Sequence, residues 1–380
     1  MKPIIRDKSV LIKKKNLERL FSIPKFPIFI GCTKKEQSTD IFSDLSFDIC
    51  RDSGVIQLSE LIPLDILYKN YHSEAIGSIW QGHHNEFLNF IQKYDMNDIL
   101  EIGGSNGALA KAYLEKNQEK KITWTIVEPG PSISDPDARL KIISDFFPTQ
   151  KIAEKKYEGV IHSHVLEHMY DPTSFLQNVT KNLKIGGYHL FSVPNLLRYV
   201  LNKQVNALNF EHTILLSEEI IDHLLQNAGF EIVDKQYYLE HSIFYATKYS
   251  GQKKVIPFPN NYTKYKNIFT EYIQSIKSVA DYFESQTDIS NDRTYIFGAH
   301  VFTQLLLNLG LTEGKLSAVL DNSKHKQGKR LYGTNLFVKS LEIVKNDKKP
   351  KVIVHAGQYQ DEIKEQLISI NPKVKIIEMK

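Results

Sequence analysis

The chain has 380 residues, of which 42% are hydrophobic, 11% aromatic and 24% charged. This ordinary globular composition excludes a disordered, collagenous or coiled-coil protein, and at roughly 150 residues per domain the length predicts two or three domains. The 48 basic and 44 acidic residues leave a formal net charge of +4, and most of the basic residues are lysines scattered among the acids. We therefore expect a solvated surface and no nucleic-acid partner.

The cysteine content and the apolar runs indicate where the protein resides. Two cysteines, Cys32 and Cys50, cannot make a disulfide framework. The segment Met1–Lys15 lacks the apolar stretch of a signal peptide, and no apolar run approaches the roughly 18 residues that a membrane span needs. We expect a cytoplasmic protein with no membrane partner, either a monomer or a homodimer.

Residues 1–75 are predicted to form a small β-rich module. Short apolar runs at Pro27–Ile30, Ser46–Cys50 and Val55–Leu58 are typical of strands. A stretch with helical apolar spacing, from about Ile76 to Ile91, then opens a second domain.

Strands and helices alternate through this second domain, residues 76–250, which predicts a parallel sheet. Asp171 followed by Pro172 is a typical helix start, and Gly229 ends a later helix. The last two strands have no helix between them, so the sheet should finish in a strand pair. In chain order we expect a strand at Asp98–Ile102, a helix at Ala108–Glu115, strands at Ile122–Val127, Leu140–Ile143 and Gly159–His162, a helix from Asp171 to about Leu183, a strand at Tyr188–Val193, a helix from Ser217 to about Asn227, and strands at Glu231–Tyr238 and Ile243–Thr247.

The remaining residues divide into a connecting region and a smaller domain. Residues 251–291 begin with a proline-containing linker and continue as a helix whose apolar face recurs along Tyr265–Phe283. Residues 292–380 should form a second α/β domain, with helices between the first two and between the last two of its strands. These strands are expected at Thr294–Phe297, Leu316–Leu320, Val352–His355 and Val374–Ile377.

The segment Glu101-Ile-Gly-Gly-Ser-Asn-Gly107 lies between a predicted strand and a predicted helix. Its glycines allow a tight turn and a close approach to a ligand, and the helix start offers unpaired N–H groups. The GGxxG spacing differs from both the dinucleotide fingerprint and the P-loop. No Lys-Ser/Thr pair follows, which disfavours a phosphate site.

Other predicted strand ends carry side chains that suit a nucleoside. Glu128 ends the strand Ile122–Val127, where a carboxylate can accept hydrogen bonds from a ribose diol. Asp145 can accept from an exocyclic amine while the adjacent Phe146 packs on a purine ring. The strand at Gly159–His162 runs into the loop that carries Val165-Leu-Glu-His168. The order of these residues along the chain, each at the end of a predicted strand, predicts a site for a nucleoside.

These motifs resemble those of the S-adenosylmethionine (SAM)-dependent methyltransferases of the seven-stranded Rossmann-like class. The resemblance covers about residues 95–250 and implies an α/β fold: a seven-stranded Rossmann-like core with a small N-terminal β unit and a second, C-terminal Rossmann-like domain. It implies SAM as the cofactor. The residues that it assigns to cofactor binding are Tyr71, His84, Glu101, Gly103, Gly104, Ser105, Gly107, Glu128, Pro129, Asp145, Phe146, Ser163 and His164.

Further segments resemble the three-domain sugar C-methyltransferases of deoxysugar pathways. The resemblance implies a small-molecule acceptor, a nucleotide-linked sugar, between the methyltransferase and C-terminal domains. It is carried by Cys50–Leu58, Tyr71-His72-Ser73 and His84, by Phe210-Glu211-His212 and Ser217, and by Gly298-Ala299-His300, Val319-Leu-Asp321, Lys326-Gln-Gly328 and Gly333.

Methyl transfer from a sulfonium requires an acceptor atom held in line, and a protonated sugar carbon or hydroxyl needs a base. Histidine suits that role near neutral pH. The resemblance implies that His212 is the general base and that Glu211 orients it. His164 and His241 are the next candidates.

The sequence departs from the family in three places, which keeps alternative functions open. Ser53 stands where a thiol would complete a zinc-binding pair with Cys50, and no histidine spacing suits a metal, so we predict no bound metal. Asn209 replaces the catalytic tyrosine, and His241 is followed by Ser-Ile-Phe instead of Gly-Gly-Ser. The alternatives are an O-methyltransferase acting on a sugar hydroxyl or another small molecule, and a non-catalytic nucleotide-binding protein, against which the intact cofactor motifs argue.

Overall fold

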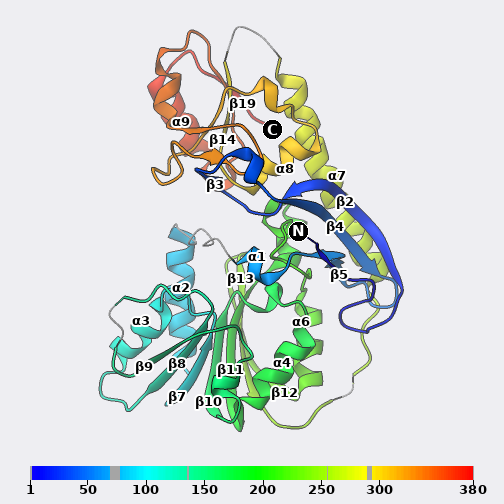
Figure 1. The fold of residues 1–380 in the computed structure, drawn as a ribbon, viewed down its shortest axis with the longest axis vertical. Coiled ribbons are helices and arrows are strands. Elements are labelled where there is room, and N and C mark those ends of the chain that lie inside the picture. Colours follow the sequence, from blue (N-terminus) through cyan, green and yellow to red (C-terminus); the bar gives the residue numbers. More distant parts are fainter. Residues whose placement is uncertain (1, 69–77, 135–136, 255, 289–292, 380) are drawn as a thin grey trace.

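The computed structural model describes residues 2–68, 78–134, 137–254, 256–288 and 293–379. Its largest sheet lies at one end of the molecule and a second sheet lies at the other (Figure 1). The N-terminal β unit, drawn in blue, lies between these two sheets on one side of the molecule. The long helix α7 (Tyr262–Gln286) runs between the two ends.

The N-terminal unit is an antiparallel sheet in the order β2-β4-β5. The predicted strand at Pro27–Ile30 was wrong, because β2 ends where that run begins. Residues such as Phe21 and Ile23 alternate with exposed neighbours along β2, and this half-buried period is a weaker signal than a continuous apolar run. The strands are β2 (Leu17–Pro27), β4 (Phe42–Cys50) and β5 (Ile56–Leu58), with the short pairs β1 (Ile4–Ile5) with β6 (Glu60–Leu61) and β3 (Cys32–Thr33) with β16 (Arg330–Leu331).

The central sheet has seven strands in the order β12-β13-β11-β10-β7-β8-β9. All neighbours are parallel except β13, which is antiparallel to both β11 and β12. The expected parallel sheet with a closing strand pair is therefore confirmed. The strands are β7 (Asp98–Ile102), β8 (Thr123–Glu128), β9 (Leu140–Ser144), β10 (Tyr157–Ser163), β11 (Leu183–Pro194), β12 (Phe230–Tyr238) and β13 (Ser242–Tyr249).

Helices cover both faces of this sheet, and each face has its own apolar core. Helices α2 (Ser78–Ile91) and α3 (Ala108–Lys116) cover one face, and α4 (Pro172–Lys181) and α6 (Glu218–Ala228) cover the other. The predicted helix starts are confirmed, because Asp171 and Ser217 each accept a hydrogen bond from a first-turn N–H.

One predicted boundary in this sheet was wrong. Strand β11 begins at Leu183, not at Tyr188, and contains the two glycines that were expected to precede it. Leu183 pairs with Tyr157 and Tyr188 pairs with Gly159, so β11 has extra residues at this irregularity. Gly186 has a φ of 81°, which glycine adopts without strain. The glycines therefore bend the strand instead of ending the helix.

The C-terminal domain is a five-stranded parallel sheet in the order β17-β15-β14-β18-β19. Numbered along the domain, the strands stand in the order 3-2-1-4-5, which matches five of the six positions of a doubly wound sheet. The expected second α/β domain is confirmed. Strand β17 was not predicted, because only two residues form it. The elements are β14 (Thr294–Phe297), α8 (Val301–Leu309), β15 (Ala318–Leu320), β17 (Val338–Lys339), β18 (Lys351–Ile353), α9 (Gln360–Ile370) and β19 (Lys375–Ile377).

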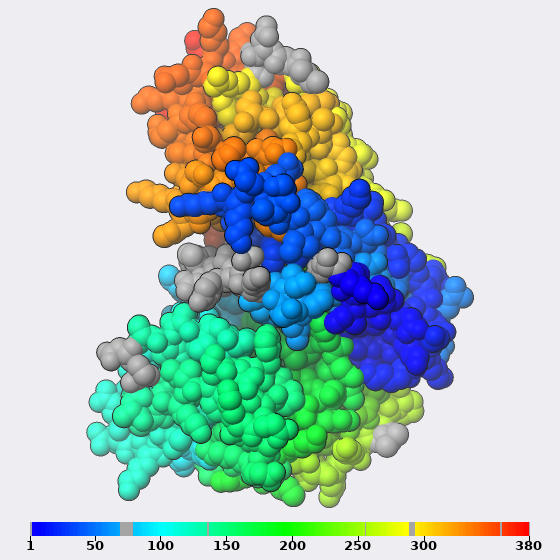
Figure 2. Space-filling view, in the orientation of Figure 1, coloured from blue at the N-terminus to red at the C-terminus, as the bar shows by residue number. Residues whose placement is uncertain are grey.

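The N-terminal unit is joined to the C-terminal domain by a buried ion pair. The Arg330 guanidinium contacts both oxygens of Asp40 at 2.7 and 2.8 Å, and the two side chains are 6% and 0% exposed. Gln304 also donates to the Phe29 carbonyl oxygen. Figure 2 shows the blue N-terminal residues lying against the orange C-terminal domain. Within the described ranges, no helix is both long and apolar enough to cross a bilayer.

Candidate functional site

The glycine loop follows β7 and leads into α3. Gly103 and Gly107 have positive φ angles of 75° and 71°, and a Cβ at Gly103 would lie 2.8 Å from Val165 Cγ2. Glu101 is buried beneath the loop and accepts a 2.8 Å hydrogen bond from Trp124 Nε1. Burial raises the pKa of Glu101 to about 7 against the opposing effect of this bond. A Cβ at Gly104 would lie 2.7 Å from Ile126 Cγ2. Packing alone thus requires glycine at both Gly103 and Gly104.

Glu128 stands at the carboxyl end of β8, beside the glycine loop. One of its oxygens accepts from the Ser105 N–H at 3.2 Å and the other accepts from the Gly130 N–H at 3.0 Å. These bonds hold both oxygens in place, and each oxygen keeps a further lone pair. Pro129, the next residue, is partly buried and its carbonyl accepts from Ser144. This arrangement suits the ribose role predicted for Glu128.

Asp145 lies next to Glu128, since its N–H donates to the Glu128 carbonyl oxygen. Its carboxylate accepts from the Thr149 hydroxyl and from its neighbour's N–H, and it pairs with Lys151 at 3.2 Å. Thr149 and Lys151 lower the pKa of Asp145, so it stays ionised. Phe146 is 42% exposed, and its ring lies 6.2 Å from that of Tyr68.

The carboxyl end of β10 brings several polar groups together. Ser163 Oγ lies 2.7 Å from Ser192 Oγ, and the next residue, His164, has a φ of 53°. The His164 ring lies between two partners: Nδ1 is 3.4 Å from Glu167 Oε1, and Nε2 is 3.1 Å from Ser242 Oγ. Glu167, in the short 3-10 helix Leu166–His168, is fully buried, and its oxygens have no hydrogen-bond partner among the described residues.

A cluster of rings packs against His164 from the other side. The Trp80 ring lies 4.8 Å from those of both His164 and His241. His83, also on α2, is fully buried, and neither of its ring nitrogens has a partner among the described residues. His84 is exposed and its ring lies 6.1 Å from Trp80. Tyr71, the other predicted N-terminal cofactor residue, falls outside the described residues.

His212 and Glu211 lie on the loop that precedes α6, and Asn209 fixes their backbone. The side-chain oxygen Oδ1 of Asn209 accepts from the N–H groups of Glu211 and His212, both at 2.8 Å. Its amide nitrogen donates to the Asn206 carbonyl at 2.9 Å and to His212 Nδ1 at 3.2 Å. Burial lowers the pKa of His212 to about 4. The ring is therefore neutral near pH 7, with Nδ1 as an acceptor.

Glu167, His168 and His212 come together although 44 residues separate the two histidines. One potential ligand atom from each lies within 4.8 Å of the others, which makes this a group that could hold a metal by distance alone. A metal-bound imidazole must offer a bare nitrogen while its other nitrogen donates a proton. In His212 the unprotonated nitrogen, Nδ1, already accepts a hydrogen bond from Asn209, and Nε2 carries the proton. The His212 ring therefore offers no free nitrogen to a metal.

The N-terminal unit does not suit the zinc site of the resembled family either. Cys50 ends β4, where its thiol donates to Asn16 Oδ1 at 3.3 Å. Ser53 is buried nearby and its hydroxyl accepts from the Val55 N–H. Cys32 lies in a different sheet, in β3. These residues cannot supply four zinc ligands around one point.

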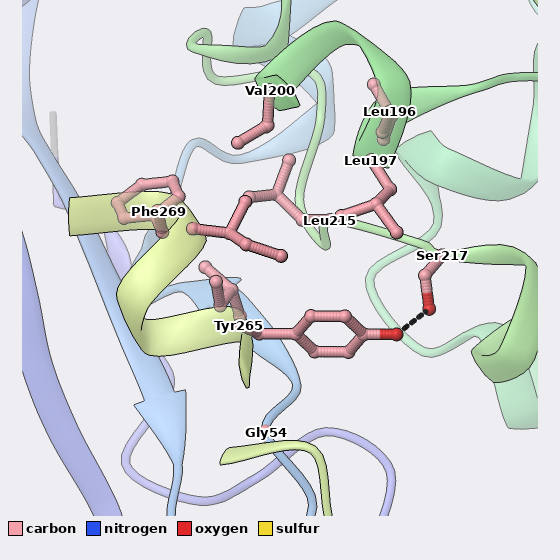
Figure 3. A pocket seen from close by; sticks show the side chains of 10 residues that line it. Gly54, Leu196, Leu197, Val200, Leu215, Ser217, Tyr265 and Phe269 are labelled. Atoms are coloured by element: carbon pink, nitrogen blue, oxygen red, sulfur yellow. Dashed lines mark hydrogen bonds between the residues drawn. The ribbon is translucent and has the colours of Figure 1, made fainter. Parts of the chain in front are cut away.

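Two pockets in the described part of the chain lie apart from these residues. An apolar pocket of about 20 Å³ lies between α5 (Leu196–Leu201), α7 and the loop before α6, where Tyr265 Oη lies 2.8 Å from Ser217 Oγ (Figure 3). Another, of about 270 Å³, is lined by residues of α4, α6 and the linker. No predicted site residue lines either pocket.

The site contains residues that sequence reasoning did not select. Tyr68 follows α1 (Leu64–Leu67), and its hydroxyl lies 3.3 Å from His168 Nδ1. Trp80, His83 and Ser242 also line the cluster. No local motif marks these residues. Glu167 is part of the motif Val165–His168, but the sequence alone does not show that it is buried next to three histidines.

Parts of the chain are similar to known methyltransferases. A protein of Mycolicibacterium smegmatis, named a “probable S-adenosylmethionine-dependent methyltransferase”, is 33% identical over 83 residues, which are 22% of this chain and 32% of that protein. The chain thus matches about one third of that relative's length. Among solved structures, a SAM-dependent methyltransferase of Mesorhizobium loti is 10% identical, with a TM-score of 0.35 over 45% of this chain and 98% of that one. The N-methyltransferase NodS of Bradyrhizobium japonicum is 15% identical, with a TM-score of 0.34 over 45% and 96%.

Two family models match the chain directly. A methyltransferase domain matches residues 78–235, and a C-methyltransferase C-terminal domain matches residues 259–375. The chain therefore contains a SAM-dependent methyltransferase domain and a C-methyltransferase C-terminal domain. The residues at the carboxyl ends of the central strands suit SAM, because Glu128 keeps acceptor capacity beside the glycine loop and Asp145 remains ionised next to it.

Proposed function

We propose that this methyltransferase acts on a nucleotide-linked sugar or a related glycan precursor. The observation that carries the proposal is the pairing in one chain of a methyltransferase domain with a C-methyltransferase C-terminal domain. The charge of +4 and its scattered lysines favour a small acceptor over a nucleic acid. When bound, SAM supplies an electrophilic methyl group.

The protein's own groups would hold the donor and the acceptor at one edge of the central sheet. Glu128 and Asp145 follow β8 and β9, and we propose that they bind the ribose and the adenine of SAM. His164, Glu167 and His168 follow β10 at the same edge, and His212 joins them from the loop before α6. Short loops at one sheet edge can hold the reacting atoms in line, which removes much of the entropic cost of the reaction.

The hydrogen bond from Asn209 changes the role that we propose for His212. Because Nδ1 accepts from the Asn209 side-chain nitrogen, which can only donate, the neutral ring carries its proton on Nε2. Such a ring can donate at Nε2 but cannot accept a proton there. We therefore propose that His212 donates a hydrogen bond to the acceptor oxygen, in place of the general-base role that the resemblance implied.

The methylated atom can be a carbon beside a ketone or a hydroxyl oxygen, and a donor at His212 serves both. With a ketone, it would stabilise the negative oxygen that forms when the neighbouring carbon loses its proton. With a hydroxyl, it would hold the sugar oxygen toward the methyl group. Asn209 in place of the family's tyrosine keeps the O-methyl alternative open.

The test is to incubate the purified protein with methyl-labelled SAM and a panel of nucleotide sugars, both ketosugars and their hydroxyl counterparts. We expect label in one nucleotide sugar and none in free sugars or oligonucleotides. Solvent-deuterium exchange at the carbon beside the ketone, without SAM, would mark a carbon acceptor. Label only in an oligonucleotide, or in no member of the panel while SAM binds, would contradict the proposal.

Two variants separate the possible roles of His212. His212→Ala should reduce turnover by about 10²–10⁴-fold, the usual range for a lost proton-transfer or hydrogen-bonding group. His212→Gln should keep more activity, because a glutamine amide can donate from near the Nε2 position. His223→Ala on α6 is the control, since the His223 ring contacts Asn227 and Phe258 instead of the residues of the proposed site. Equal loss in both His212 variants would favour the base role instead.

A further inference from the structure

Four residues form a continuous line of polar contacts through the proposed site. Glu167 Oε1 lies 3.4 Å from His164 Nδ1, and His164 Nε2 lies 3.1 Å from Ser242 Oγ. Ser242 Oγ then lies 2.6 Å from His241 Nδ1. The line runs from a carboxyl group whose side chain is 1% exposed to a ring that is partly exposed. It connects the end of β10 to the turn between β12 and β13.

The line has a direction when Glu167 is ionised. A carboxylate can only accept, so His164 presents its N–H at Nδ1 and a bare Nε2. The Ser242 hydroxyl then donates to His164 Nε2, and its oxygen accepts from the N–H at His241 Nδ1. The remaining nitrogen of His241, Nε2, is bare, and no described residue forms a hydrogen bond with it. A basic nitrogen is therefore presented at the exposed end of the line.

The backbone places this nitrogen close to the proposed chemistry. The His241 carbonyl accepts from the Asn195 N–H at 2.9 Å, which fixes the turn to the end of β11. The His241 ring lies 4.8 Å from Trp80 and 5.7 Å from His164. It therefore shares the strand-end edge with the residues that follow β10.

We propose that His241 is the proton acceptor of the methyl transfer, and that Ser242 and His164 pass the proton inward to Glu167. The proposal rests on the proposed function, because it concerns the acceptor proton of that reaction. His241 would be a catalytic residue, and Ser242, His164 and Glu167 would be positioning and relay residues.

The protons and charges balance along the line. The acceptor's proton bonds to His241 Nε2, and His241 releases its Nδ1 proton to Ser242 Oγ. Ser242 gives its hydroxyl proton to His164 Nε2, and His164 releases its Nδ1 proton to Glu167. One proton enters, one carboxylate becomes a carboxylic acid, and no imidazolium remains. The electron pair left on the acceptor atom attacks the methyl group.

Burial favours this final state on both ends of the line. It lowers the pKa of His241 to about 4 and that of His164 well below its usual value, so a charged imidazolium is costly there. Burial also raises the pKa of Glu167. Transfer to Glu167 neutralises its buried charge, whereas a proton that stayed on either ring would create a second one. The 3.4 Å gap between Glu167 and His164 needs to close by about 0.5 Å to form a normal hydrogen bond.

The test measures kcat and KM with the acceptor that the panel identifies. His241→Ala should lower kcat by about 10²–10⁴-fold with KM and SAM affinity within a few-fold of wild type, and added imidazole should restore part of the rate. Ser242→Ala should lower kcat at least tenfold, while Ser242→Thr, which keeps the hydroxyl, should retain most of it. Glu167→Gln should lower kcat with little change in KM. His223→Ala is again the control.

The outcomes separate this inference from the proposed function. If wild-type protein methylates no nucleotide sugar, the proposed function fails, and the relay fails with it. If wild type is active and His241→Ala keeps near-wild-type kcat, only the relay is overturned. The relay would also be overturned if the loss of kcat in His241→Ala is not restored by imidazole and comes with lost SAM affinity or a lowered melting midpoint. His241→Gln repeats the measurement with a side chain closer in size to histidine. Equal activity in Ser242→Ala and wild type would contradict proton transfer from His241 through Ser242 to Glu167.

Discussion

Replacement of Glu128 tests the cofactor assignment most directly. In the structure its two oxygens accept from the Ser105 and Gly130 N–H groups. Each oxygen can accept one further hydrogen bond, which is what a ribose diol requires. A hydrogen bond to a charged group contributes about 1.5–3 kcal/mol. Glu128→Ala should therefore cost about 3–6 kcal/mol of SAM binding, which is roughly a 10²–10⁴-fold rise in Kd.

Glu128→Gln gives a graded version of the same test. One carboxylate oxygen becomes an NH₂ group that faces a backbone N–H, whichever way the amide turns, so one ribose acceptor is lost. We expect a rise in Kd of about 10–100-fold, because one charge-assisted bond is lost. Isothermal titration calorimetry with SAM and S-adenosylhomocysteine measures both variants.

Glu158 on β10 provides a matched control. Its carboxylate also accepts from a backbone N–H, that of Asn97, at 2.9 Å. Asn97 directly precedes β7, so Glu158 lies at the amino edge of the sheet, opposite Glu128. Glu158→Gln should leave SAM affinity unchanged. A Kd for Glu128→Ala within threefold of wild type, or an equal loss in Glu158→Gln, would refute the reasoning.

Three further predictions concern stability and metal content. Asp40→Asn should lower the free energy of unfolding by about 3–5 kcal/mol in urea titration, because it leaves the Arg330 charge buried without its partner. Asp7→Asn, in the exposed pair with Lys15, should change the free energy of unfolding very little. Equal losses in the two variants would contradict this. The folded protein holds the Glu101 proton more tightly than the unfolded chain, because the pKa of Glu101 is about 7 in the fold and 4.5 normally. Relative to Glu101→Gln, the wild type should therefore lose about 3 kcal/mol of unfolding free energy as the pH rises from 4.5 to 7, and nothing more above pH 7. Parallel pH profiles of the two proteins would refute this. Elemental analysis should find no stoichiometric zinc, since Cys32 and Cys50 lie in different sheets, and one zinc per chain would be the contrary result.

The sequence allowed the central sheet to be predicted because its strands are buried on both faces. Runs such as Asp98–Ile102 stand out when every position is apolar or core-facing. Strand β2 was misplaced because only alternate residues are buried, and β17 was missed because two residues carry no period. The glycines near Gly186 were read as a helix end because glycine marks both stops and bulges.

The predicted cofactor residues from Gly103 to His164 lie at the ends of strands or directly after them, so a motif in the sequence fixes their position in space. The residues that we propose to handle the acceptor's proton are different. Tyr68, His164, His212 and Ser242 come from four separate segments, and only the folded chain brings them around Glu167. Local spacing cannot reveal such a group.

The same distinction explains why His212 is open to a different role from the one that its motif implied. A motif gives the residue type at a position, but the function of an imidazole depends on which nitrogen holds the proton. In this chain that is decided by Asn209, whose orientation is fixed by two backbone N–H groups and a backbone carbonyl. With His212 restricted to donating, we propose that the bare nitrogen of His241 takes the acceptor's proton.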